Sequence, residues 1–253
     1  MRILIAGFPH SGTSILRKII GNHPEVHDYY QSEVARYPRP RGLGVFKRLL
    51  PYEYCGKRHV VFKIPRHDVE LSTNADRIIY VIKNPFDVFA SLNIRSESAL
   101  PDSCSLAAWQ DYAKYFLDKR FSGRCYKVRY EDLFPHDFAL VKAIFSWLDL
   151  DWDDSVLNTE SRYTPIRYEG HMPSSEPPRT QHPAFRAWQT SQKLENLAGR
   201  NRHFLDDRVR RAVEDLLEVR MLGYSAESLS PTPRLMYGDG ALSNPFRTLP
   251  VSA

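Results

Sequence analysis

The first twenty residues place the strongest limit on the fold, because they specify a strand, a tight loop and a helix in succession. The apolar run Ile3–Ala6 predicts a short buried strand. The small residues of Gly7–Gly12 predict a tight turn, and Ser14–Ile20 predicts a helix that Gly21 ends. Such a unit directs backbone N–H groups and a helix N-terminus toward one point, where an anion, usually a phosphate, binds.

The loop departs from the Walker A pattern at one position. Counted from Gly7, the pattern G-x-x-x-x-G-K-[ST] is met except that Thr13 occupies the lysine position. That lysine contacts the β- and γ-phosphates of a nucleoside triphosphate, so its absence argues against an ATP or GTP hydrolase. A shorter anion without a γ-phosphate fits better. An ordinary strand-to-helix turn without a ligand is the alternative interpretation of this motif taken alone.

Strand and helix patterns alternate along the rest of the chain. Further strands are predicted at His59–Ile64, Arg77–Ile82 and Cys125–Arg129. Further helices are predicted at Pro85–Ile94, Ser105–Lys119, Asp137–Leu148 and Asp206–Leu222, with residues 25–58 and 159–184 irregular. The alternation predicts an α/β fold with three layers, α/β/α, around a central parallel sheet, as in P-loop nucleoside-triphosphate hydrolases. We expect one domain over residues 1–224 and an irregular tail over 225–253.

Composition narrows the class of partner. A net charge of +5 suits a small anionic ligand and is mild for a nucleic-acid-binding protein. The three cysteines have no C-x-x-C spacing, so neither a disulfide framework nor a zinc site is predicted. No apolar run approaches the roughly 20 residues of a membrane span, and the apolar run at the N-terminus is too short for a signal peptide. We expect a cytoplasmic protein without a membrane or nucleic-acid partner.

A second segment has the same order of strand, loop and helix as the first. The apolar strand at Arg77–Ile82 ends at a cation, Lys83, and Pro85 suits the first turn of the next helix. Ser91 follows Lys83 by eight residues, about two helical turns. The lysine and the serine are therefore placed to contact one phosphate. A surface lysine and a helix serine without a ligand are the alternative.

Together these segments resemble the sulfotransferases that use 3′-phosphoadenosine 5′-phosphosulfate (PAPS). Residues 9–14, PHSGTS, are similar to that family's 5′-phosphosulfate loop, P-[KR]-S-G-T-[TS]. Residues 83–85, KNP, with Ser91, are similar to its 3′-phosphate motif, and residues 130–133, YEDL, to a motif whose tyrosine lies near the adenine. A weaker match, residues 179–188, is similar to the family's late phosphate loop. The resemblance implies that the cofactor contacts Pro9, Ser11, Gly12, Thr13, Ser14, Lys83, Ser91, Tyr130 and Arg179.

The resemblance implies transfer of the sulfuryl group of PAPS to a hydroxyl or amine of a small molecule or glycan. The product would be adenosine 3′,5′-bisphosphate, and no metal is implied. The family's lysine or arginine at position 10 is expected to neutralise the leaving bridge oxygen. His10 can do so only as a cation or a hydrogen-bond donor, because an ordinary histidine has a pKa of about 6.5. Lys83 occupies a position where the family more often has arginine, and lysine cannot make arginine's two parallel hydrogen bonds.

Two residues compete for the role of general base, which must take a proton from the acceptor. Glu33 resembles the glutamate of family members that act on carbohydrates. His67 resembles, with a displacement of a few residues, the histidine of cytosolic members. We favour Glu33, although it can equally be a solvated loop acid, and His67 can simply pair with Asp68. Lys63 is expected to help stabilise charge in the transition state.

Two other functions remain open from the sequence. The first is a P-loop kinase-like phosphotransferase, which the missing Walker lysine and the absence of an obvious acidic strand end for magnesium argue against. The second is a protein that binds a nucleotide or nucleic acid without catalysis. The modest positive charge and the scattered aromatic residues of this chain do not favour that role.

Overall fold

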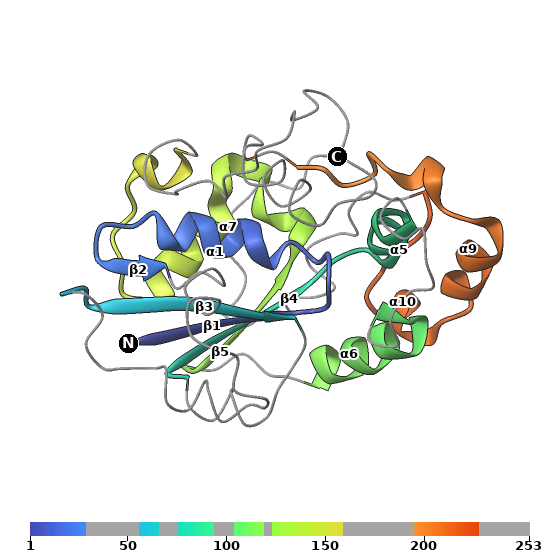
Figure 1. Ribbon diagram of the computed structural model, residues 1–253, viewed down its shortest axis with the longest axis horizontal. Helices are drawn as coiled ribbons and strands as arrows, with labels where there is room; N and C mark the ends of the chain where they lie inside the picture. Colours follow the sequence, from blue (N-terminus) through green and yellow to red (C-terminus); the bar gives the residue numbers. More distant parts are fainter. Residues whose placement is uncertain are drawn as a thin grey trace, which may run out of the picture.

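The computed structural model describes residues 1–28, 56–65, 75–93, 104–118, 123–158, 194 and 196–227. Within them, five strands form one sheet in the order β2-β3-β1-β4-β5 (Figure 1). The strands are β1 (Arg2–Gly7), β2 (Val26–Asp28), β3 (His59–Pro65), β4 (Arg77–Ile82) and β5 (Cys125–Arg129). Every neighbouring pair is parallel. Parallel strands need crossover connections, and within the described residues helices lie in those from β1 to β2 and from β4 to β5.

Helices cover both faces of this sheet. The longer ones are α1 (Thr13–Gly21), α5 (Pro85–Asn93), α6 (Leu106–Asp118), α7 (Pro135–Trp147), α9 (Asp207–Glu214) and α10 (Leu217–Met221). Short 3-10 turns are η2 (Tyr130–Leu133), η3 (Asp154–Leu157) and η4 (Arg202–Phe204). Figure 1 shows α1 and α7 on one face of the sheet and α6 on the other. No helix in the described ranges is long and apolar enough to span a bilayer.

The central strand β1 shows why the sequence gives three layers. Its side chains alternate between two cores, because successive residues of a strand point to opposite faces. Leu4 and Ala6 join the core that includes residues of α5 and α6. Ile3 and Ile5 join the core that includes residues of α1 and α7. All four are fully buried, which is why β1 is a continuous apolar run. The predicted α/β fold with a parallel sheet is confirmed.

Two elements differ from the sequence prediction. β2 lies in a stretch predicted to be irregular, because three residues are too few to show a periodic pattern. The predicted single helix Asp206–Leu222 is wrong, since it is divided into α9 and α10. The break is at Leu216, whose backbone is extended with ψ 128°. In one continuous helix Val213 and Val219 would point about 120° apart around the axis, whereas with the break both lie in the same core.

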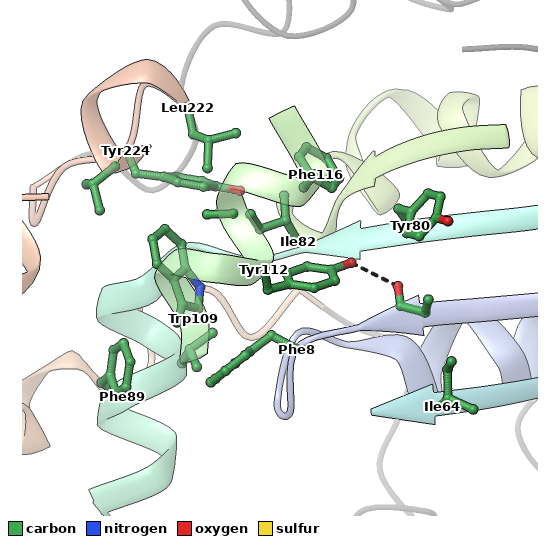
Figure 2. Packing of buried hydrophobic residues seen from close by; sticks show 14 of the residues in the cluster. Phe8, Ile64, Tyr80, Ile82, Phe89, Trp109, Tyr112, Phe116, Leu222 and Tyr224 are labelled. Atoms are coloured by element: carbon green, nitrogen blue, oxygen red, sulfur yellow. Dashed lines mark hydrogen bonds between the residues drawn. The ribbon is translucent and has the colours of Figure 1, made fainter. Parts of the chain in front are cut away.

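An aromatic cluster supports the sheet beneath the β1–α1 loop. Figure 2 shows Phe8, Phe89, Trp109 and Tyr112 packed together. The Tyr112 hydroxyl lies 3.1 Å from the carbonyl oxygen of Ala6 and 3.0 Å from that of Val81. These carbonyls belong to β1 and β4 near their carboxyl ends. Tyr112 therefore fixes the strand ends from which the loop and Lys83 emerge.

Candidate active site

The carboxyl edge of the sheet gathers several of the predicted residues. The loop of residues 8–12 follows β1, Lys83 follows β4 and Tyr130 follows β5, while Lys63 lies near the end of β3. The helix after β1 packs on one face of the sheet, and the helix after β4 contributes to the core of the other. Ligands of open α/β sheets bind at such a switch point, outside the carboxyl ends of the strands.

The loop ends in a left-handed glycine that starts α1. Gly12 has φ 88° and is the N-cap of the helix, and no described side chain caps this end. Its carbonyl accepts the first helical hydrogen bond, from Ile15 N–H at 3.0 Å. The N–H groups of Thr13 and Ser14 precede any helical acceptor, as the first N–H groups of a helix do. With the positive end of the helix dipole, they form a site that favours an anion.

Ser11 adds an unsatisfied hydroxyl to this loop. Its side chain is fully buried, and its Oγ has no hydrogen-bond partner among the described residues. The loop folds tightly on the strand end, because a Cβ at Gly7 would lie 2.5 Å from both Ser11 Oγ and Thr13 Cγ2. An unpaired buried hydroxyl is costly, and an oxygen of a bound anion would satisfy it. The loop therefore fits the phosphosulfate group that the resemblance implies.

His10 joins the loop to the second motif. Its Nδ1 lies 2.9 Å from Ser91 Oγ on α5, and both side chains are half-buried. Which of the two donates depends on the histidine tautomer. Pro9 is half-buried beside it. Two motifs predicted separately thus meet through one hydrogen bond, although 81 positions separate them.

Tyr130 fills the space between the loop and Lys83. The Lys83 ammonium lies 4.2 Å from the centre of the buried Tyr130 ring. The same ring approaches Gly12 so closely that a Cβ there would lie 2.1 Å from Tyr130 Cδ2. The Tyr130 hydroxyl accepts a hydrogen bond from Leu197 N–H at 3.2 Å. The tyrosine therefore sets the position of both anion-binding motifs at once.

Lys63 contacts the start of α1. Its Nζ donates to Ser14 Oγ at 2.6 Å. This places the ammonium group of a β3 residue at the start of the helix that follows the loop, and its role in stabilising transition-state charge stays a prediction. Glu33, His67 and Arg179 lie outside the described residues. The choice between Glu33 and His67 as general base therefore stays a prediction.

A buried carboxyl supports the second motif, and sequence reasoning did not assign it a role. Glu131 accepts hydrogen bonds from Asn84 N–H at 2.8 Å and from the Tyr224 hydroxyl at 3.2 Å. Burial raises the pKa of Glu131 to about 7, although the hydrogen bond from Asn84 N–H and the nearby Lys83 oppose the shift. The available signal was an acidic residue two positions after a buried strand, in the motif YEDL.

An ion pair holds a late segment against α5. Asp87, in the first turn of α5, accepts from Arg202 Nε at 2.8 Å and from Gly199 N–H at 2.9 Å. Arg202 also donates to the carbonyl of Ala226 at 2.6 Å. Both Asp87 and Arg202 are well shielded from water, which makes such a pair more than a surface contact. The helix that carries Ser91 is thus braced by residues more than 100 positions later.

Comparison with known proteins agrees with this geometry. Residues 1–221 match the family described as the sulfotransferase domain. Sulfotransferase 4A1 of Mus musculus is 22% identical over 182 residues, which cover 62% of this chain and 63% of that protein. The Homo sapiens protein of the same name is 23% identical over 180 residues, or 61% and 62% of the two chains. The chain thus spans less than two thirds of these curated relatives.

Solved structures show the same fold. Mouse sulfotransferase SULT7A1 complexed with PAP has a TM-score of 0.55 at 17% identity, over 87% of this chain and 84% of that one. The sulfotransferase domain from the curacin biosynthetic pathway has a TM-score of 0.50 at 14% identity, over 88% and 97%. The family resemblance predicted from three short motifs is confirmed by the match over residues 1–221. The chain therefore belongs to the sulfotransferase domain family.

Proposed function

We propose that the protein transfers the sulfuryl group of PAPS to a hydroxyl or amine of a small molecule or glycan. The observation that carries the proposal is the hydrogen bond between His10 and Ser91. It joins an anion-binding helix start to a strand-end lysine motif. A ligand that uses both must carry two separated anionic groups. A nucleotide with phosphates on its 3′ and 5′ positions has that form.

The residues divide between the two ends of such a ligand. Ser11, Gly12, Thr13 and Ser14 would hold the 5′ end through N–H groups and hydroxyls. Lys83 and Ser91 would hold the 3′-phosphate through a charge-assisted and a neutral hydrogen bond. The bound cofactor supplies an activated sulfuryl group. Charge stabilisation and positioning are then the main tasks of the protein.

Two nitrogen-bearing side chains stand close to the loop where charge would develop. His10 would donate a hydrogen bond to the leaving oxygen, with its ring oriented by Ser91. Lys63 is oriented by Ser14 and adds positive charge on the β3 side. The acceptor would lose its proton to Glu33 or His67. Exchange of each for alanine, followed by measurement of turnover, decides between them.

Adenosine 3′,5′-bisphosphate is expected to stabilise the protein without magnesium. At one hundred times its Kd, a ligand adds about 2.7 kcal/mol to the free energy of unfolding. For a chain of this size that corresponds to a rise in Tm of about 5–10 °C. A thermal-shift series with the bisphosphate, ATP and GTP, each with and without magnesium, measures this. Greater stabilisation by ATP with magnesium would favour a phosphotransferase instead.

Lys83→Ala is expected to weaken bisphosphate binding about 10- to 150-fold, because a charge-assisted hydrogen bond contributes roughly 1.5–3 kcal/mol. Ser91→Ala loses a neutral bond worth about 1 kcal/mol, so its loss of affinity is about fivefold. Lys127→Ala is the matched control. Its ammonium also lies over an aromatic ring, 4.8 Å from the centre of Phe116, and it belongs to β5. Calorimetric Kd values unchanged in both Lys83→Ala and Ser91→Ala would remove the second motif from the site.

A further inference from the structure

We propose that Glu131 takes up a proton when the anionic cofactor binds beside Lys83, so that cofactor binding and protonation of this buried carboxyl are coupled. The inference rests on the proposed function, since it concerns the occupancy of the same site. Glu131 does not contact the ligand in this account. It is a positioning residue for the peptide that carries Lys83.

The contacts of Glu131 place it directly behind the second motif. Its side chain is 1% exposed, and its two carboxyl oxygens have different donors. Oε1 accepts from the N–H of Asn84, the residue after Lys83, at 2.8 Å. Oε2 accepts from the Tyr224 hydroxyl at 3.2 Å. The carboxyl therefore fixes the end of β4 from behind, and any change of its charge is felt at Lys83.

Among the described residues, three titratable groups face this carboxyl. Lys83 approaches it from the end of β4, Arg129 from β5 and Tyr224 from the segment after α10. Asn84, which lies between β4 and α5, faces it with an uncharged backbone N–H. Arg129 forms a fork with Asp132, at 2.7 Å from Nε and 2.9 Å from the second terminal nitrogen. Its charge is thus largely balanced by a partner of its own.

Lys83 is therefore the cation whose influence a ligand would change. In the free protein, burial raises the pKa of Glu131 to about 7, while the positive charge of Lys83 holds it lower than burial alone would. A phosphate bound to Lys83 brings negative charge to the same place and cancels that influence. The pKa of Glu131 then rises further, and the carboxylate takes a proton from solvent. No other bond is made or broken.

Thermodynamic linkage between proton uptake and cofactor binding fixes the direction in which affinity changes with pH. The bound state holds more protons than the free state, so affinity falls as pH rises. The fall reaches at most tenfold per pH unit, in the window above the free-state pKa of about 7. Below that window Glu131 is protonated in both states and the dependence on pH disappears. A carboxyl that is only structural would give no such slope.

Calorimetric titration with adenosine 3′,5′-bisphosphate at pH 7.5, in three buffers of different ionisation enthalpy, counts the protons. Wild type is expected to take up about half a proton more than Glu131→Gln. The amide keeps an acceptor for Asn84 N–H but cannot titrate. The phosphates of the ligand itself titrate near pH 6, and their contribution is shared by both proteins, so the difference isolates Glu131.

Tyr224→Phe gives a second test that leaves Glu131 in place. It removes one donor to the charged carboxylate, which raises the pKa of Glu131 in the free protein. More of the carboxyl is then protonated before binding, and the uptake at pH 7.5 is expected to be smaller than in wild type. Equal proton counts in wild type and Glu131→Gln, or an unchanged count in Tyr224→Phe, would overturn the coupling. Failure of wild type to bind the bisphosphate would contradict the proposed function itself.

Discussion

Gly12→Ala is expected to abolish detectable binding of adenosine 3′,5′-bisphosphate. An alanine Cβ at this position would lie 2.1 Å from Tyr130 Cδ2, and the ring it meets is buried. Overpacking of this kind costs about 1–3 kcal/mol, and a left-handed backbone adds about 1–2 kcal/mol for a residue with a Cβ. Movement of the ring would also displace Lys83, which lies against it. Both anion-binding motifs are therefore damaged by one methyl group.

The chain contains a matched control for this substitution. Gly56 also has a positive φ, 75°, but a Cβ there meets no atom within 4 Å. Gly56→Ala therefore carries the backbone strain without the clash. We expect it to lower Tm slightly and to bind the bisphosphate with wild-type affinity. Calorimetry and circular dichroism on both variants separate loss of the site from loss of the fold. Wild-type affinity in Gly12→Ala would show that the Tyr130 ring moves aside without loss of the site.

His10→Ala is expected to lower turnover about 10- to 150-fold while changing the Kd of the bisphosphate little. A hydrogen bond to a charged group contributes roughly 1.5–3 kcal/mol, and the charge on the leaving oxygen exists only during transfer. The product lacks that developing charge, so its binding does not report the interaction. Steady-state kinetics beside calorimetric titration measures the two quantities. Equal turnover of wild type and His10→Ala at pH 7 would reduce His10 to a loop residue.

Two further variants test how His10 works. His10→Lys is expected to restore part of the turnover, because lysine keeps its charge at neutral pH. The restoration is partial, since position 10 has φ 70°, which histidine tolerates better than most residues. Ser91→Ala is expected to slow turnover in the wild-type background and to have little further effect in His10→Ala. A double-mutant cycle that is additive would show that the 2.9 Å contact does not orient the ring.

The local sequence pattern was sufficient to predict most of the fold and the anion-binding loop. Ile3–Ala6 and the glycines around it lie next to one another in the chain, so the strand, the turn and the helix start follow from neighbouring residues alone. The same holds for Lys83 and Ser91, which are two turns apart on one strand-to-helix unit. What failed was a helix boundary: Leu216 is extended between two valines that lie in one core, and this tertiary contact is not visible in the local pattern.

The contacts that hold the motifs together could not be predicted in this way. Asn84 and Glu131 are 47 positions apart, and Glu131 and Tyr224 are 93 apart. A tyrosine in the segment after a helix and a glutamate after a strand give no sign that they share a hydrogen bond. The Tyr130 ring between Gly12 and Lys83 is likewise a product of the sheet order. Only the assembled sheet brings β1, β4 and β5 side by side.

The hydrogen bond between Asn84 and the last described segment has a consequence for folding during synthesis. Asn84 Nδ2 donates to the carbonyl of Ser225 at 3.4 Å, across 141 positions. At about 5–20 residues per second, the ribosome needs about 7–28 s to add those positions. A nascent chain therefore carries both anion-binding motifs well before the residues that brace the second one exist. A protein shortened to residue 221 would keep every residue of the family match and still lack Tyr224, Ser225 and Ala226.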